Sequence, residues 1–112
     1  MNMGKYDNIR SNVTQMLKEE FTGFEYKGHG ANIGVWETTD FQDLEKPFGD
    51  SYTLAMFRIL VFIPIGYGMN IKIEILLPSV GEWETVFEGY VSSLTNIPEI
   101  LNFQLGLQKA VR

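Results

Sequence analysis

Only a few residues in this 112-residue sequence have side chains suited to catalysis. His29 is the sole histidine, and it lies between Gly28 and Gly30, where we expect the tip of a hairpin turn. Nucleophilic catalysis of the Ser-His type needs a histidine that a carboxylate orients beside a hydroxyl group. A glycine-flanked turn is too loose for that geometry, so we interpret His29 as an exposed turn residue.

Four carboxylates, Asp40, Asp43, Glu45 and Asp50, gather in the stretch 39–50. Calcium loops need oxygen ligands at tight, alternating spacing with a glycine at the bend, and this spacing matches no such loop. The sequence contains no cysteine, which excludes disulfides, thiolate metal sites and a thiol nucleophile. We therefore expect no metal, no cofactor and no enzymatic activity.

Arg58 interrupts an otherwise aliphatic strand between Leu54 and Ile65. A buried arginine must be paired, and the sequence offers Glu74 or Glu88 as the partner. The alternative is that Arg58 lines a pocket on the open face of a sheet and binds an anionic small ligand.

The elements that position these residues begin with a helix that Asp7 is placed to cap. Its apolar residues follow one helical stripe: Ile9, Val13, Met16, Leu17 and Phe21. A first hairpin is predicted from strands over 24–27 and 31–38. In the second of these strands Ile33 and Val35 point one way. Trp36 points the other way, either half-exposed or under the loop 39–50.

A second hairpin is predicted from strands over 52–65 and 69–77, with Gly66-Tyr67-Gly68 as a three-residue turn that sets Ile65 opposite Met69. One face of this hairpin is wholly aliphatic and must be covered by helices. The other face is mixed and carries Arg58, Leu60, Phe62, Asn70, Lys72 and Glu74. In this register Arg58 and Glu74 are diagonal neighbours, close enough to pair.

The stretch after Pro78 fits two templates. As a strand, Trp83, Thr85 and Phe87 alternate with polar residues. As a helix, six apolar positions from Trp83 to Leu94 share one face, and Ser79 with Glu82 forms a capping box. We favour the helix. A final helix is predicted over Ile97 to Ala110. The fold class is then α+β, with the order αββββαα: a four-stranded antiparallel sheet of two hairpins, one N-terminal helix and two C-terminal helices in a single domain, 1–112.

Charge and hydropathy limit the classes of partner. The net charge is −5 and the nine basic residues are scattered, so we expect no direct binding of nucleic acid. The longest apolar run falls well short of the roughly 20 residues that cross a bilayer, so we expect no membrane span. No basic, apolar leader precedes the first helix, and we expect a cytoplasmic protein.

The predicted order of a helix, an antiparallel meander and closing helices in a small acidic protein resembles the type III secretion chaperones. The passage Ile75–Trp83, read as strand-Leu-Leu-Pro-Ser-helix, resembles suppressor-of-fused-like domains. Neither resemblance includes a diagnostic motif and each covers less than half of the chain, so we assign no family.

The leading hypothesis is a small, non-enzymatic protein-binding module of the inhibitor, immunity or adaptor type. A long loop with acidic and aromatic residues and an uncovered sheet face would bind the protein partner, and a homodimer is possible. The predicted contact residues are Trp36, Asp40, Phe41, Asp43, Leu44, Phe48, Arg58, Phe62, Lys72 and Glu74. The alternatives are a self-assembling viral or phage structural subunit, and a small-ligand binder or enzyme that uses Arg58.

Overall fold

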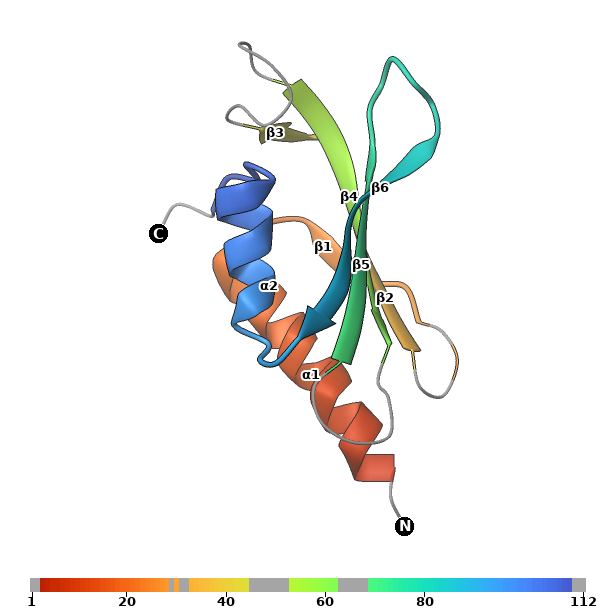
Figure 1. Cartoon of the computed structure of the whole chain (residues 1–112), viewed down its shortest axis with the longest axis vertical. Coiled ribbons are helices and arrows are strands. Elements are labelled where there is room, and N and C mark those ends of the chain that lie inside the picture. The colour runs from red at the N-terminus through yellow and green to blue at the C-terminus, as the bar shows by residue number, and fades with distance from the viewer. Residues whose placement is uncertain (1–2, 29, 31–32, 45–52, 63–68, 110–112) are drawn as a thin grey trace.

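The computed structural model describes residues 3–28, 30, 33–44, 53–62 and 69–109, without the side chains of 3–7 and 53. The described chain is α+β, with an antiparallel sheet between an N-terminal and a C-terminal helical segment (Figure 1). The elements are α1 (Met3–Glu20), β1 (Phe24–Tyr26), β2 (Ile33–Thr38), β3 (Gln42–Leu44), β4 (Thr53–Phe62), β5 (Met69–Leu76), β6 (Trp83–Val91), α2 (Asn96–Glu99) and the π-helical η1 (Ile100–Gln104). The predicted count of four strands and three helices is wrong, because over the described residues the sheet has six strands and there are two helical segments, α1 and the continuous α2–η1.

The sheet is antiparallel throughout, with the order β1-β2-β4-β5-β6, and β3 also pairs with β4. β2 and β3 lie along the same edge of β4: Glu37 is opposite Arg58, and Gln42 is opposite Ala55. Four residues, 38–41, therefore stand across from only two, 56–57. The Thr38 hydroxyl accepts a hydrogen bond of 2.9 Å from the Phe57 N–H at this irregularity, which keeps a buried donor satisfied.

Both helical segments pack into one hydrophobic core. Val13, Leu17 and Phe21 of the predicted α1 stripe are buried, and Ile9 and Met16 pack against them, so the stripe is confirmed. α1 is longer than predicted because it begins at Met3 rather than near Asp7.

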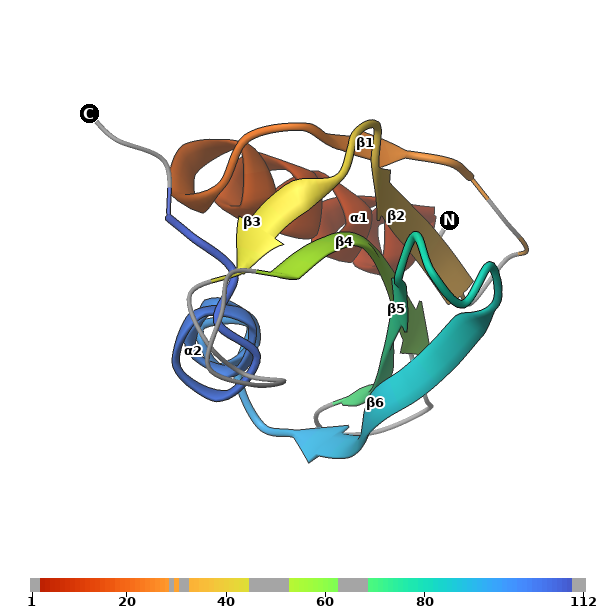
Figure 2. The same ribbon diagram turned by 90° about the horizontal axis from the view of Figure 1, so that it is seen from above.

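The strands curve, and α2 lies across the opening between β3 and β6 (Figure 2). The C-terminal segment supplies buried side chains to the core: Ile97, Ile100, Leu101, Leu105 and Leu107.

The predicted faces of the β4–β5 hairpin are confirmed, although the register differs. Ile59 lies opposite Ile73 and Val61 opposite Ile71, which is two residues away from the predicted pairing. An even shift leaves every side chain on its predicted face, whereas a one-residue slip would have exchanged the faces. The predicted turn at 66–68 lies outside the described residues.

The prediction of a helix after Pro78 is wrong: residues 83–91 form β6, which pairs with β5. Pro78-Ser79-Val80-Gly81 is a tight turn, in which the N–H groups of Val80 and Gly81 both donate to the Leu77 carbonyl at 3.1 Å. Gly81 has φ +77, a conformation that glycine adopts at little cost. The polar pair that suggested a capping box therefore belongs to a hairpin.

A bulge in β6 explains why its sequence imitates a helix. Thr85 pairs with Glu74 and Phe87 with Ile73, so Val86 is an extra residue in the ladder. Such a residue shifts the phase of the two-residue alternation. Apolar residues on both sides of the bulge then fall at spacings of three and four, which are helical spacings.

The final helix begins near the predicted residue but ends early. α2 starts at Asn96, and η1 ends at Gln104 rather than near Ala110. The chain then turns back, with N–H groups of Gly106 and Leu107 bonded to the carbonyls of Asn102 and Leu101. Leu107 forms an isolated β-bridge with Leu44 of β3, which attaches the C-terminal segment to the sheet.

Candidate functional site

One face of the sheet carries neither helix (Figure 1). Residues directly opposite in an antiparallel ladder point to the same face, so the registers define which side chains lie there. We call this the outer face. From β2 to β6 it comprises Ile33, Val35, Glu37, Met56, Arg58, Leu60, Phe62, Asn70, Lys72, Glu74, Leu76, Trp83, Thr85, Glu88 and Tyr90.

Arg58 stands at the centre of a charged network on the outer face. Its Nε donates to Glu74 Oε1 at 2.6 Å, and its Nη1 lies 3.6 Å from Glu37 Oε2. Its guanidinium carbon lies 4.2 Å from the centroid of the Trp83 ring, within the range of a cation–π contact. Lys72 Nζ approaches the other oxygen of Glu74 at 4.0 Å. The predicted pairing of Arg58 with Glu74 is confirmed, with the two residues directly opposite rather than diagonal.

This network is half-buried although no helix or strand among the described residues covers it. The side chain of Glu74 is 13% exposed and that of Arg58 is 26% exposed. Two carboxylates and an aromatic ring therefore hold the guanidinium in place on a rigid sheet. Such an arrangement presents a fixed, planar group with little side-chain entropy left to lose on binding.

Apolar side chains adjoin the network on the outer face. Leu60 lies opposite Val35 on one side and Lys72 on the other. Phe62 is 39% exposed and lies opposite Asn70, which in turn lies opposite Tyr90 at 57% exposed. The outer face thus combines Arg, Trp, Tyr and Phe, which are enriched where proteins bind one another.

Two of the predicted contact residues are not on a surface. Trp36 is 1% exposed, because it lies opposite Ile59 on the core face, and its Nε1 donates to the Thr14 hydroxyl of α1 at 2.9 Å. Leu44 is 0% exposed beneath the Leu107 bridge. The prediction that Trp36 lines the open face is wrong, since the alternation in β2 places Ile33 and Val35 there instead.

The predicted loop 39–50 is partly a strand. Asp40 and Phe41 are exposed at the irregularity between β2 and β3, and Asp43 is exposed on β3 opposite Leu54. Asp43 shares the side of the sheet that Arg58 occupies, whereas Phe48, Glu45 and Asp50 lie outside the described residues. Of the predicted residues, the structure brings Arg58, Phe62, Lys72 and Glu74 together.

Sequence reasoning missed Trp83, Glu37 and Tyr90 as residues of the outer face. Glu37 could have been predicted from the alternation of β2, because it follows Ile33 and Val35 at intervals of two residues. Trp83 and Tyr90 were assigned to the buried side of a helix, and only the strand interpretation of 83–91 places them beside Arg58.

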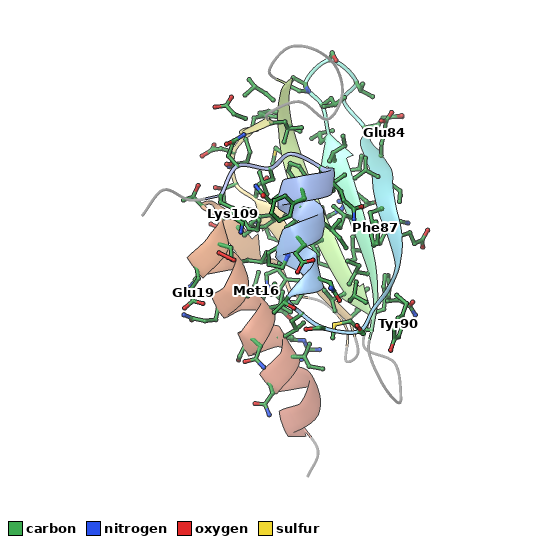
Figure 3. All side chains as sticks on the ribbon, turned by 60° about the vertical axis from the view of Figure 1, so that its left-hand side comes forward. Met16, Glu19, Glu84, Phe87, Tyr90 and Lys109 are labelled. Carbon is green, nitrogen blue, oxygen red and sulfur yellow. The ribbon has the colours of Figure 1, made fainter. Side chains whose placement is uncertain are left out.

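Metal sites, membrane spans and a groove are the remaining features to consider in the described chain. No group of three or more His, Asp or Glu side chains is placed to hold a metal ion in the parts that the structure describes. Within the same residues, no helix combines the length and apolar content that a bilayer span requires. A groove of about 530 Å³ lies between α1 and the C-terminal segment, where Lys109 Nζ is 3.9 Å from Glu20 Oε1 and 5.8 Å from the Phe103 ring centroid (Figure 3).

Comparison with known proteins gives no assignment: no protein-family model, curated protein or solved structure matches this chain.

Proposed function

We propose that this chain is a small, non-enzymatic protein-binding module that contacts its partner through the outer face. The observation that carries the proposal is the uncovered network in which Arg58 is fixed by Glu74, Glu37 and Trp83. An inhibitor, immunity protein or adaptor would use such a face.

The state of Arg58 favours a protein partner over a small anion. Its guanidinium already contacts two carboxylates, so an anionic ligand would either displace one of them or bind close to both, and each case is unfavourable for like charges. A protein partner can instead cover the network intact and dehydrate it, which strengthens each charged contact. Phe62 and Tyr90 supply exposed apolar area beside it.

The test is affinity capture from a lysate of the source organism with the wild-type chain and two variants, read by quantitative mass spectrometry. Phe62→Glu places a charge on the outer face, and Val80→Glu places the same charge on the β5–β6 turn, where Val80 is 45% exposed. We expect a stoichiometric partner with wild type and with Val80→Glu, and loss of that partner with Phe62→Glu.

Two results would contradict the proposal. One is a partner retained equally by both variants. The other is recovery of the bait alone together with a dimer in light scattering that Phe62→Glu abolishes, since the outer face would then be a self-association surface. Circular dichroism of both variants checks that each is folded.

A further inference from the structure

β6 is a long strand, and one of its edges is free among the residues that the structure describes. It is the last strand in the sheet order, and within the described residues it pairs only with β5. β1, at the other end of that order, has three residues, whereas β6 has nine. A free edge presents a row of backbone N–H and C=O groups that can pair with another chain.

The edge is unsuited to pairing with a second copy of itself. Glu84 and Glu88 of β6 and the preceding Glu82 are exposed, and no ion pair between described residues involves them. Two such edges side by side would oppose like charges, which is destabilising. The same carboxylates would instead attract a strand that carries Lys or Arg side chains.

A groove beside the edge is placed to receive side chains of an added strand. Its volume is about 280 Å³, and it lies between β6 and the C-terminal helical segment (Figure 3). Phe87 and Tyr90 line it from the strand, and Glu99, Ile100 and Gln104 line it from α2 and η1. A strand that pairs with β6 points alternate side chains to opposite faces. One set would enter this groove and the other set would lie beside Glu88 on the outer face.

We infer that β6 accepts an extended, basic segment of a partner protein as an additional strand. Apolar side chains of that segment occupy the groove against Phe87 and Ile100. The alternate set carries Lys or Arg toward Glu88 on the outer face, and one basic side chain on the groove side, beyond the groove, faces Glu84, which lies opposite Ile75. Backbone pairing gives the affinity, and the groove and the carboxylates give the selectivity. The inference rests on the proposed protein-binding function, but it names the edge of β6, which borders the outer face at Glu88 and Tyr90.

The first experiment selects peptides from a phage-displayed library of random sequences on the whole chain. We expect enriched peptides to alternate Lys or Arg with apolar residues. The double variant Glu84→Lys/Glu88→Lys should weaken the best peptide by at least about tenfold in Kd, because two opposite-charge contacts become repulsive.

The control Glu19→Lys/Glu25→Lys makes the same change in net charge on exposed residues of α1 and β1. This control should bind the selected peptide with a Kd within about twofold of the wild-type value, because salt screens charges that are distant from the edge. Enriched peptides that lack basic residues, or that bind both double variants equally, would overturn the inference.

A second experiment tests the backbone pairing itself. Only alternate amides of an added strand face β6, so N-methylation of that set should abolish binding and N-methylation of the other set should leave it intact. Amide hydrogen exchange of β6 should slow on binding. Equal binding of the two methylated peptides would overturn strand addition.

The outcomes separate this inference from the proposed function. If Phe62→Glu abolishes binding of the selected peptide and Glu84→Lys/Glu88→Lys does not, the peptide binds the outer face. That result refutes the edge site but still supports a protein-binding module. The edge site would also be refuted if the wild-type chain enriched no peptides relative to the Glu84→Lys/Glu88→Lys chain. In that case, capture of a partner that is lost with Phe62→Glu would still support the proposed function.

Discussion

Arg58 and Glu74 face each other directly across β4 and β5, and their side chains are joined by a hydrogen bond of 2.6 Å. This pair lies on a sheet face without a helix, yet Glu74 retains only 13% exposure. Lys72 Nζ lies 4.0 Å from the other oxygen of this carboxylate, and the Trp83 ring lies against the Arg58 guanidinium.

Arg58→Met should lower the free energy of unfolding by about 1–3 kcal/mol, because it leaves a largely buried carboxylate without its main cation. Urea denaturation measures the change. Lys27→Met is the matched control, since the Lys27–Glu25 pair is 44% and 58% exposed and should contribute less than about 1 kcal/mol. Adding Glu74→Gln to Arg58→Met should recover part of the loss. No recovery would assign the loss to the Trp83 contact instead.

Thr14→Val should destabilise the chain by about 1–3 kcal/mol, because it removes the hydroxyl that accepts a hydrogen bond from the buried Trp36 N–H and keeps the side-chain shape. The midpoint of thermal or urea unfolding reports the change. Thr14→Ser retains a hydroxyl and should preserve most of the stability. Equal stability of the valine and wild-type chains would show that the bond between α1 and β2 contributes nothing.

Gly34→Ala should destabilise the chain by about 1–3 kcal/mol through overpacking. A Cβ at Gly34 would lie 2.4 Å and 2.7 Å from two carbons of the Trp36 ring, and that ring is enclosed by the core. Gly89→Ala is the control, because its nearest neighbours would be Phe87 carbons at 3.6 Å and 3.7 Å, an ordinary contact. Urea midpoints compare the two. If Gly34→Ala were as stable as Gly89→Ala, the Trp36 ring would not lie over Gly34.

Gly81→Ala distinguishes the observed hairpin from the predicted helix by the sign of its effect. In the turn, φ is +77 and alanine should cost about 1 kcal/mol or more. In a helix, the same substitution would stabilise by about 1 kcal/mol. No atom lies within 4 Å of the added Cβ, so the unfolding free energy reports backbone conformation alone. Stabilisation by Gly81→Ala would contradict the β5–β6 turn. Asn tolerates positive φ, so the free energy of unfolding of Gly81→Asn should fall between those of the wild type and Gly81→Ala.

The faces of β4 and β5 and the stripe of α1 were predictable because burial repeats at one constant period along each element. Ile59, Ile71 and Ile73 alternate without interruption, as do the polar residues between them. The same constancy allowed the pairing of Arg58 with Glu74 to be predicted before the register was known.

The remaining elements depend on irregularities that local periodicity does not encode. The extra residue Val86 changes the phase of β6, and the four residues opposite 56–57 interrupt what would otherwise be one strand along β4. β3 is three residues long and is stabilised by the edge of β4 and by Leu107 from far along the chain. Trp36 is buried because α1 supplies Thr14, a contact between segments that no local pattern indicates.

The bridge between Leu44 and Leu107 has a consequence for synthesis of the chain in the cell. Each pair of neighbouring strands from β4 to β6 is joined by a short local connection, so this meander can form as soon as it leaves the ribosome. Its core still lacks the side chains of Ile97, Leu101 and Leu107, which emerge later. Until residue 107 has left the ribosome, the nascent domain therefore exposes apolar surface that these side chains later cover.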